Sequence, residues 1–200
     1  MQREVLWTGI GGQGVQLATE LLAAAAVAEG RHAMFFGSYG GMMRGGNSET
    51  TLVLGDRPVQ SPPTIGSTWS ALVLHPAHAA GTLAKLRPDG VLVLNTTLYA
   101  DDVPHPGPVV RVPATELATA VGSANAVTMV ALGAYAAATR IAGLDALTAV
   151  LPDVLPPYRH RHLAVNRAAL RAGHDATEPL VDAWADSADG ARRVAEEATP

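Results

Sequence analysis

The stretch VLWTGIGGQGV at residues 5–15 decides how this chain folds. It begins with a short apolar run, passes through a glycine-rich turn and continues into 15–29, where alanine and leucine recur at helical spacing. Gly30 stands where a glycine usually ends a helix, and 33–36 then has the apolar character of a second strand. This order of strand, helix and strand predicts that a βαβ unit opens the protein.

Alternating strand and helix patterns continue outward from this unit. We expect further strands at 48–54, 71–74, 91–94 and 109–112, with a helix at 77–86. Helical patterns follow at 115–121, 126–141, 144–151 and 159–172. The sequence therefore predicts an α/β fold, a doubly wound and mostly parallel sheet with helices on both faces and a helical C-terminal half. We expect residues 1–174 to form one domain and 175–200 to form a C-terminal tail or docking helix.

Composition narrows the class of protein. The chain has 200 residues, 48% of them apolar and 16% charged, which suits one sizeable core. It contains no cysteine, so it can form no disulfide, thiolate zinc site or Cys-ligated iron–sulfur cluster. Its formal charge of −4 argues against a nucleic-acid partner.

Two features of the sequence, its first residues and its longest apolar helical stretch, indicate where in the cell the protein is expected. The first residues lack the pattern of a signal peptide, so we expect a cytoplasmic protein. The helical apolar stretch 126–139 is shorter than the roughly 20 residues that cross a bilayer. We therefore expect no association with a membrane.

The first glycine motif, GIGGQG at residues 9–14, has the spacing G-x-G-x-x-G between a strand and a helix. Glycines there permit a tight turn, while the helix N-terminus directs unpaired N–H groups at an anion. A dinucleotide site would also need an acidic residue after the second strand, but 35–38 reads FFGS. We therefore expect a contact with a phosphate or a partner rather than NAD. The alternative is that the glycines only let the helix pack closely on the sheet.

A second glycine motif, SYGGMMRGGNS at 38–48, follows the second strand. Loops at the carboxyl ends of parallel strands face one crevice, so this loop would bring Arg44 close to the first motif. Arginine binds phosphate or carboxylate through two parallel hydrogen bonds. The alternative is a flexible loop with Arg44 in solvent.

Other candidate chemistry is weaker. The histidines are densest in HRH at 160–162, but positions i and i+2 do not share a helical face, so no metal site is expected. With no cysteine and no G-x-S-x-G elbow, nothing supports a hydrolase acting alone.

Seven motifs in register give the chain a resemblance to a known family. They are GIGGQGV at 9–15, SYGGMMRGGNSE at 38–49, PVQSP at 58–62, NTT at 95–97, PATE at 113–116, NAVTMVALG at 125–133 and NRAALRAG at 166–173. Together they make the chain similar to the gamma subunit or domain of 2-oxoacid:ferredoxin oxidoreductases, over nearly its whole length.

The resemblance implies a subunit of an enzyme that is inactive alone. Such assemblies convert a 2-oxoacid and coenzyme A to acyl-CoA and CO2 and pass electrons to ferredoxin. It implies alpha-type and beta-type partners that hold thiamine diphosphate and iron–sulfur clusters, and it leaves open a ferredoxin-like subunit. We also expect that the isolated chain self-associates. An alternative is a standalone nucleotide- or CoA-binding module.

The resemblance also points to the two glycine loops as the entrance for coenzyme A, a cosubstrate, or the 2-oxoacid. The residues expected to bind there are Gly11, Gly12, Gln13, Gly14, Ser38, Tyr39, Arg44, Gly45, Gly46 and Asn47. Two positions depart from the family pattern. Met42 and Ser70 stand where the family usually has carboxylates, which leaves the particular oxoacid open.

Overall fold

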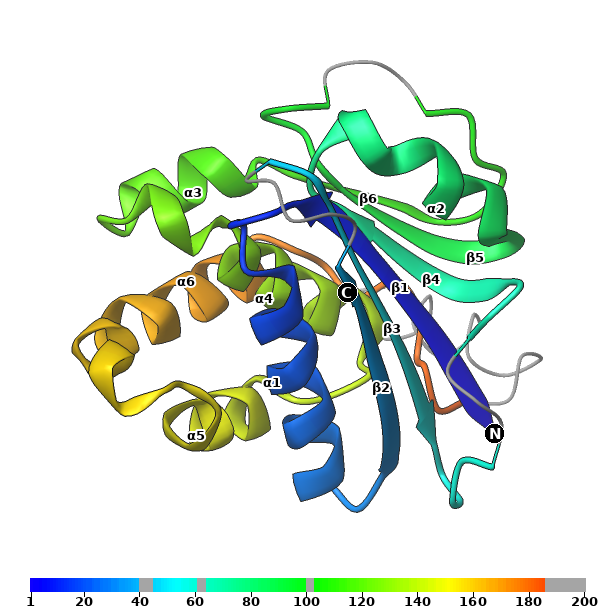
Figure 1. The fold of residues 1–200 in the computed structure, drawn as a ribbon, viewed down its shortest axis with the longest axis horizontal. Helices are drawn as coiled ribbons and strands as arrows, with labels where there is room; N and C mark the ends of the chain where they lie inside the picture. Colours follow the sequence, from blue (N-terminus) through cyan, green and yellow to red (C-terminus); the bar gives the residue numbers. More distant parts are fainter. Residues whose placement is uncertain (40–44, 61–63, 100–102, 186–200) are drawn as a thin grey trace, which may run out of the picture.

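The structure is a computed structural model that describes residues 1–39, 45–60, 64–99 and 103–185 (Figure 1). Its centre is a six-stranded sheet in the order β2-β3-β1-β4-β5-β6. The strands are β1 Gln2–Ile10, β2 His32–Tyr39, β3 Asn47–Gly55, β4 Thr68–Val73, β5 Leu86–Asn95 and β6 Val109–Val112. Each strand overlaps a segment that the sequence predicts as a strand, and the predicted α/β class is confirmed.

The sheet is mixed: β1, α1 and β2 form the expected opening βαβ unit, and β3 is inserted between its two parallel strands. Strand β3 lies between β1 and β2 and pairs antiparallel with both, whereas β1, β4, β5 and β6 run parallel. Only seven residues separate Tyr39 from Asn47, and a parallel pair needs a crossover of a dozen or more residues. The short connection therefore makes β2 and β3 a hairpin, and β3 occupies the place beside β1 that β2 would have taken.

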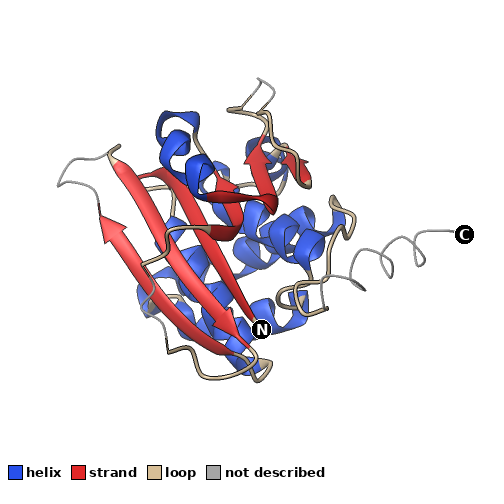
Figure 2. Ribbon diagram, turned by 90° about the vertical axis from the view of Figure 1, so that its right-hand side faces the viewer, coloured by secondary structure: helices blue, strands red, loops and turns tan. Residues whose placement is uncertain are grey.

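Helices cover both faces of the sheet unequally. The helices are α1 Val15–Ala28, α2 Ala79–Lys85, α3 Ala114–Ala120, α4 Val127–Thr139, α5 Leu144–Val154 and α6 Leu163–Asp175. Three 3-10 turns precede α2, α4 and α6: η1 Pro76–His78, η2 Ala124–Ala126 and η3 Pro157–His162. A small cluster joins α2 to β4 and β5, while the large core contains residues of α1, α3, α4, α5 and α6 (Figures 1 and 2).

Helix α4 is the centre of the large core, since twelve of its thirteen residues are buried. It packs against α6 at a point where both helices have a glycine. A Cβ atom at Gly133 would overlap the carbonyl group of Leu170, and one at Gly173 would overlap that of Val130. The two backbones can therefore approach this closely only because both side chains are absent.

The segment after α6 packs on the domain through residue 185. The indole Nε1 of Trp184 donates a 3.0 Å hydrogen bond to the carbonyl oxygen of Ile141, and the Arg31 guanidinium lies 4.0 Å from the centre of the Trp184 ring. On the other side, Arg3 Nε donates to the carbonyl oxygen of Ala183 at 2.5 Å. These contacts tie the segment to β1 and to the residues that follow α1 and α4. In the described parts of the chain, no helix combines the length and apolar character needed to cross a membrane.

Candidate functional site

The first glycine loop connects β1 to α1 and is held by its own glutamine. Gln13 Oε1 accepts a 2.9 Å hydrogen bond from the N–H of Ile10, and the N–H of Gln13 donates to the carbonyl oxygen of Ile10 at 3.1 Å. Gly12 and Gly14 have φ values of 99° and 84°, in the left-handed region that favours glycine. Gly14 is the N-cap residue of α1, and no side chain makes a capping hydrogen bond there. The first turn of α1 therefore keeps N–H groups available for a ligand.

The second glycine loop touches the first. The N–H of Gly11 donates a 2.8 Å hydrogen bond to the carbonyl oxygen of Gly46, and Thr8 Oγ1 donates to Asn47 Oδ1 at 3.2 Å. Gly45 has a φ of 86°, which again favours glycine. Because β1 and β2 end on the same side of the sheet, the structure brings the two motifs together.

The predicted residues of the second motif are only partly described. Ser38 and Tyr39 are the last residues of β2, where their backbones pair with Glu49 and Ser48. Arg44 and Met42 lie outside the described residues. A contact between Arg44 and an anion therefore stays a prediction.

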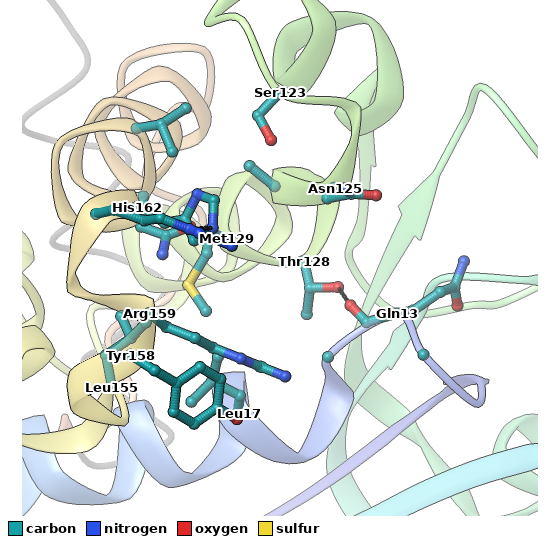
Figure 3. Close-up of a pocket in the computed structure, with 16 residues that line it drawn as sticks. Gln13, Leu17, Ser123, Asn125, Thr128, Met129, Leu155, Tyr158, Arg159 and His162 are labelled. Carbon is teal, nitrogen blue, oxygen red and sulfur yellow. Dashed lines mark hydrogen bonds between the residues drawn. The ribbon is translucent and has the colours of Figure 1, made fainter.

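A cavity of about 330 Å³ opens beside the first loop (Figure 3). It is formed by three segments that are far apart in sequence: the loop with the start of α1, the region from η2 into α4, and the region from Leu155 through η3 into α6. The lining residues are Gly12, Gln13, Gly14, Leu17, Ser123, Asn125, Ala126, Thr128, Met129, Leu155, Tyr158, Arg159, Arg161, His162, Val165 and Asn166. Three of the motifs that carry the family resemblance therefore meet at one cavity, from residues 9–15, 125–133 and 166–173.

A hydrogen bond fixes the wall of this cavity. Thr128 Oγ1, near the start of α4, donates a short hydrogen bond to the carbonyl oxygen of Gln13 (Figure 3). Thr128 is buried and belongs to the motif NAVTMVALG. The bond holds the glycine loop against α4, so the position of the loop depends on a residue 115 positions away.

A second cavity of about 250 Å³ adjoins the first on the side of α1 and β3. Both are lined by Gly12, Gly14, Leu17 and Arg159. Ser48, the residue after Asn47, also lines the second cavity. This cavity includes one carboxylate, that of Glu20, which accepts a 3.0 Å hydrogen bond from Gln16 Nε2.

The charged residues that line the larger cavity are all basic. Its lining includes Arg159 and Arg161 together with His162, and none of its lining residues is acidic. Arg161 Nε donates a 3.1 Å hydrogen bond to His162 Nε2, and in the described part of the chain neither arginine is paired with a carboxylate. The sequence pattern singles out the histidines of this segment as metal-site candidates, and the predicted site did not include its arginines. The signal that could have found them is the pair of arginines among histidines at 159–162, with no acid nearby.

The histidines do not gather into a metal site. His160 Nε2 lies 3.0 Å from the carbonyl oxygens of Pro152 and Leu155, which places its ring against the chain before η3. His162 faces the cavity (Figure 3). Among the residues that the structure describes, no three His, Cys, Asp or Glu side chains are arranged to hold a metal ion.

Ser70, one of the two departures from the family pattern, lies in the core and not at the cavity. It is fully buried on β4, and its hydroxyl lies 2.7 Å from the hydroxyl of Tyr135 on α4. Burial raises the pKa of Tyr135 well above its usual value, against the opposing effect of the Ser70 hydrogen bond. The Tyr135 ring also packs edge-on against Trp7, with ring centres 5.2 Å apart. The residue at position 70 therefore contributes to the packing of α4 on the sheet.

Comparison with known proteins supports the resemblance seen in the motifs. Residues 4–176 match the family model described as pyruvate ferredoxin/flavodoxin oxidoreductase. This range covers the cavity, the helices α1 to α6 and all of the sheet except the first two residues of β1.

Individual relatives are similar over most of their length. The gamma subunit of an NADH-dependent phenylglyoxylate dehydrogenase from Aromatoleum evansii is 29% identical over 176 residues, which cover 86% of this chain and 92% of the relative. The common gamma subunit of pyruvate/ketoisovalerate oxidoreductases from Thermococcus kodakarensis is 27% identical, covering 75% and 85%. The crystal structure of a keto/oxoacid ferredoxin oxidoreductase gamma subunit from Geobacter sulfurreducens has a TM-score of 0.74 at 27% identity, covering 86% of this chain and 96% of that one.

Proposed function

This chain belongs to the pyruvate ferredoxin/flavodoxin oxidoreductase family, and we propose that it is the gamma-type subunit of a thiamine diphosphate-dependent 2-oxoacid:acceptor oxidoreductase complex. The observation that carries the proposal is the size of the match. The chain spans 92% and 85% of two curated gamma subunits and 96% of a gamma subunit of known structure. It therefore matches most of the length of a gamma-type unit in each of these relatives.

The reaction of the complex is oxidation of a 2-oxoacid with coenzyme A to acyl-CoA and CO2, with electrons leaving to ferredoxin. The chain has no cysteine to ligate an iron–sulfur cluster. We therefore assign the clusters and thiamine diphosphate, which supplies the carbanion chemistry, to alpha-type and beta-type partners and a ferredoxin-like subunit. The role of this chain is to complete the assembly.

Within the assembly, the two glycine loops and the adjoining cavity form part of the entrance for coenzyme A or the 2-oxoacid. Both are anions, and the arrangement suits an anion. The first turn of α1 carries partial positive charge at Gly14, and Arg159 borders both cavities. The chain binds and orients the incoming ligand here, while the reacting atoms lie on partner subunits.

The experiment purifies the tagged full-length chain from its own source cells and identifies the chains that co-purify. A thiamine diphosphate-binding partner, together with CoA-dependent reduction of a low-potential electron acceptor by the purified complex, would support the proposal. The chain alone, supplied with thiamine diphosphate and acceptor, should show no turnover. A stable monomer that binds nucleotide and recruits no such partner would instead favour a standalone binding module.

A further inference from the structure

Strand β2 forms one edge of the sheet. In the strand order it has β3 on one side and, within the described part of the chain, no strand on the other (Figure 1). It pairs with β3 along its whole length, from His32 to Tyr39, without a shift in register. A regular edge strand of this kind presents a row of backbone N–H and C=O groups with which a further strand can pair.

The opposite edge, β6, has features that keep a sheet edge from pairing. It has only four residues, is flanked by Pro108 and Pro113, and carries the charged Arg111. Strand β2 has eight residues, and its sequence HAMFFGSY contains no proline and no Asp, Glu, Lys or Arg. Short strands, prolines and charged side chains are the usual protection of an edge, and β2 lacks all three.

The side chains of β2 alternate between the two faces of the sheet. Ala33 and Phe35 pack against the large core, which includes α1. Phe36 points to the other face, opposite Thr51 of β3, and remains 50% exposed. None of the side chains described on β2, those of residues 32–37, is fully buried. An aromatic ring in the middle of an unprotected edge would gain from burial by another strand.

From these observations we propose that β2 pairs antiparallel with β2 of a second copy of this chain, about a two-fold axis beside Phe36. Side chains directly opposite each other in an antiparallel pair lie on the same face, so the two Phe36 rings meet on the exposed face. Residues 33–39 of the two copies pair, and the two sheets join into one. Residues 32–37 line neither cavity, so this interface goes beyond the proposed function.

The charge of β2 favours a second copy as the partner. A two-fold axis brings each edge residue close to edge residues of an identical strand, so an edge with charges of one sign would repel itself. The sequence of residues 33–39 has no such charge. The two strands also have the same length and the same unpaired backbone groups. Of the two edges of the sheet, β2 is the one without protection, so β2 of the second copy, and not its β6, is the strand available for pairing.

The first test measures the oligomeric state of the full-length chain by sedimentation equilibrium over a range of concentrations. The wild type should be a dimer that dissociates on dilution. Phe36→Lys should weaken dimerisation at least about tenfold, because it removes the ring and places two ammonium groups opposite each other, whereas Phe36→Tyr should retain the dimer. Leu98→Lys is the matched control. Leu98 is 42% exposed and follows β5, outside the proposed interface, so this variant should change the dissociation constant less than about twofold.

Single cysteines test the register, because the chain has no cysteine of its own. Under oxidising conditions Phe36→Cys should form a disulfide-linked dimer, since the two copies of residue 36 face each other. Met34→Cys is the control on the same face of the same strand. The two copies of residue 34 would lie about 14 Å apart, beyond the roughly 7 Å that a disulfide can span between Cα atoms.

Hydrogen exchange at individual amides distinguishes strand pairing from a contact of side chains alone. The N–H groups of β2 that do not bond to β3 should exchange slowly in the dimer and rapidly in Phe36→Lys. Thermal melts show whether each variant folds. If Phe36→Lys does not fold, the two cysteine variants and the wild-type exchange still decide.

Four results would each overturn the proposal. They are a wild type that is monomeric at every concentration, equal losses of dimer in Phe36→Lys and Leu98→Lys, equal cross-linking of Met34→Cys and Phe36→Cys, and a dimer whose outer β2 amides are unprotected. In a complex purified with its partners, a cross-link from position 36 to a different chain would show that a partner strand, and not a second copy, occupies this edge.

Discussion

The backbone N–H of Gly11 donates a 2.8 Å hydrogen bond to the carbonyl oxygen of Gly46, so the two glycine loops are in direct contact. The first loop is also bonded to Thr128 on α4. Segments separated by more than a hundred residues thus meet at the first glycine loop, the turn between β1 and α1. Changes that move this turn should affect both stability and ligand binding.

Gly14→Ala should destabilise the fold by about 1–2 kcal/mol, because a residue with a Cβ is strained at a φ of 84° even though the surrounding space is open. Chemical denaturation measures the change in the free energy of unfolding. Gly81→Ala on α2 is the control, since it also meets open space but has no positive φ, and it should be neutral or stabilising by up to about 1 kcal/mol. Equal effects of the two substitutions would contradict the strain at Gly14.

Gly133→Ala and Gly173→Ala should each destabilise the protein by about 1–3 kcal/mol or more, because the new methyl group would overlap the backbone of the facing helix. Thermal melting of the purified variants checks this. The same Gly81→Ala variant controls for helix propensity, which alone would make glycine-to-alanine changes stabilising. Wild-type melting temperatures in both core variants would show that α4 and α6 do not approach as closely as described.

The buried Ser70 and Tyr135 hydroxyls should be energetically coupled. Ser70→Ala leaves the Tyr135 hydroxyl without its partner and should cost about 1–3 kcal/mol, whereas Ser70→Ala combined with Tyr135→Phe should cost less than the sum of the single changes. A double-mutant cycle built from urea unfolding measures the coupling, expected at about 1 kcal/mol. Strictly additive effects would show that the two hydroxyls do not share a hydrogen bond.

Tyr135 should also make the fold sensitive to alkali. Its pKa is raised above the ordinary 10.0 in the folded state, so the folded protein keeps the proton that the unfolded chain loses. The stabilisation is therefore fully present below pH 10.0 and declines as the pH rises above it toward the folded-state pKa. Tyr135→Phe should show a shallower loss of stability above this pH, measured as the free energy of unfolding against pH. Parallel curves for the variant and the wild type would contradict this origin.

Trp184→Ala should destabilise the domain by about 2 kcal/mol, since it removes the hydrogen bond to Ile141, the contact with Arg31 and apolar packing. Trp184→Phe retains a ring for Arg31 and should recover part of this loss. Denaturant unfolding followed by circular dichroism compares the three proteins. If Trp184→Ala were as stable as the wild type, the segment after α6 would contribute nothing to the fold.

The first glycine loop is the part of the candidate site that could be anticipated from sequence, because its signals are local. The glycines at 11, 12 and 14 reveal a turn by their spacing alone, and the strand before and the helix after follow from apolar periodicity. The arginines of η3 were not anticipated as part of this site. Arg159 follows Gly14 by some 145 residues in the sequence. A cluster of basic residues gives the same sequence pattern whether its side chains face solvent or a cavity.

The sequence by itself determined the elements of this protein, because helix and strand periodicity and glycine at left-handed positions are properties of neighbouring residues. Tertiary structure alone decided that β3 lies between β1 and β2, that Ser70 is buried against Tyr135, and that Arg159 lines the same cavities as Gly12 and Gly14. Each of these depends on contacts between residues far apart in the chain. Such contacts form because the sheet and its helices bury a shared apolar core. A local sequence pattern does not indicate which distant residues this burial brings into contact.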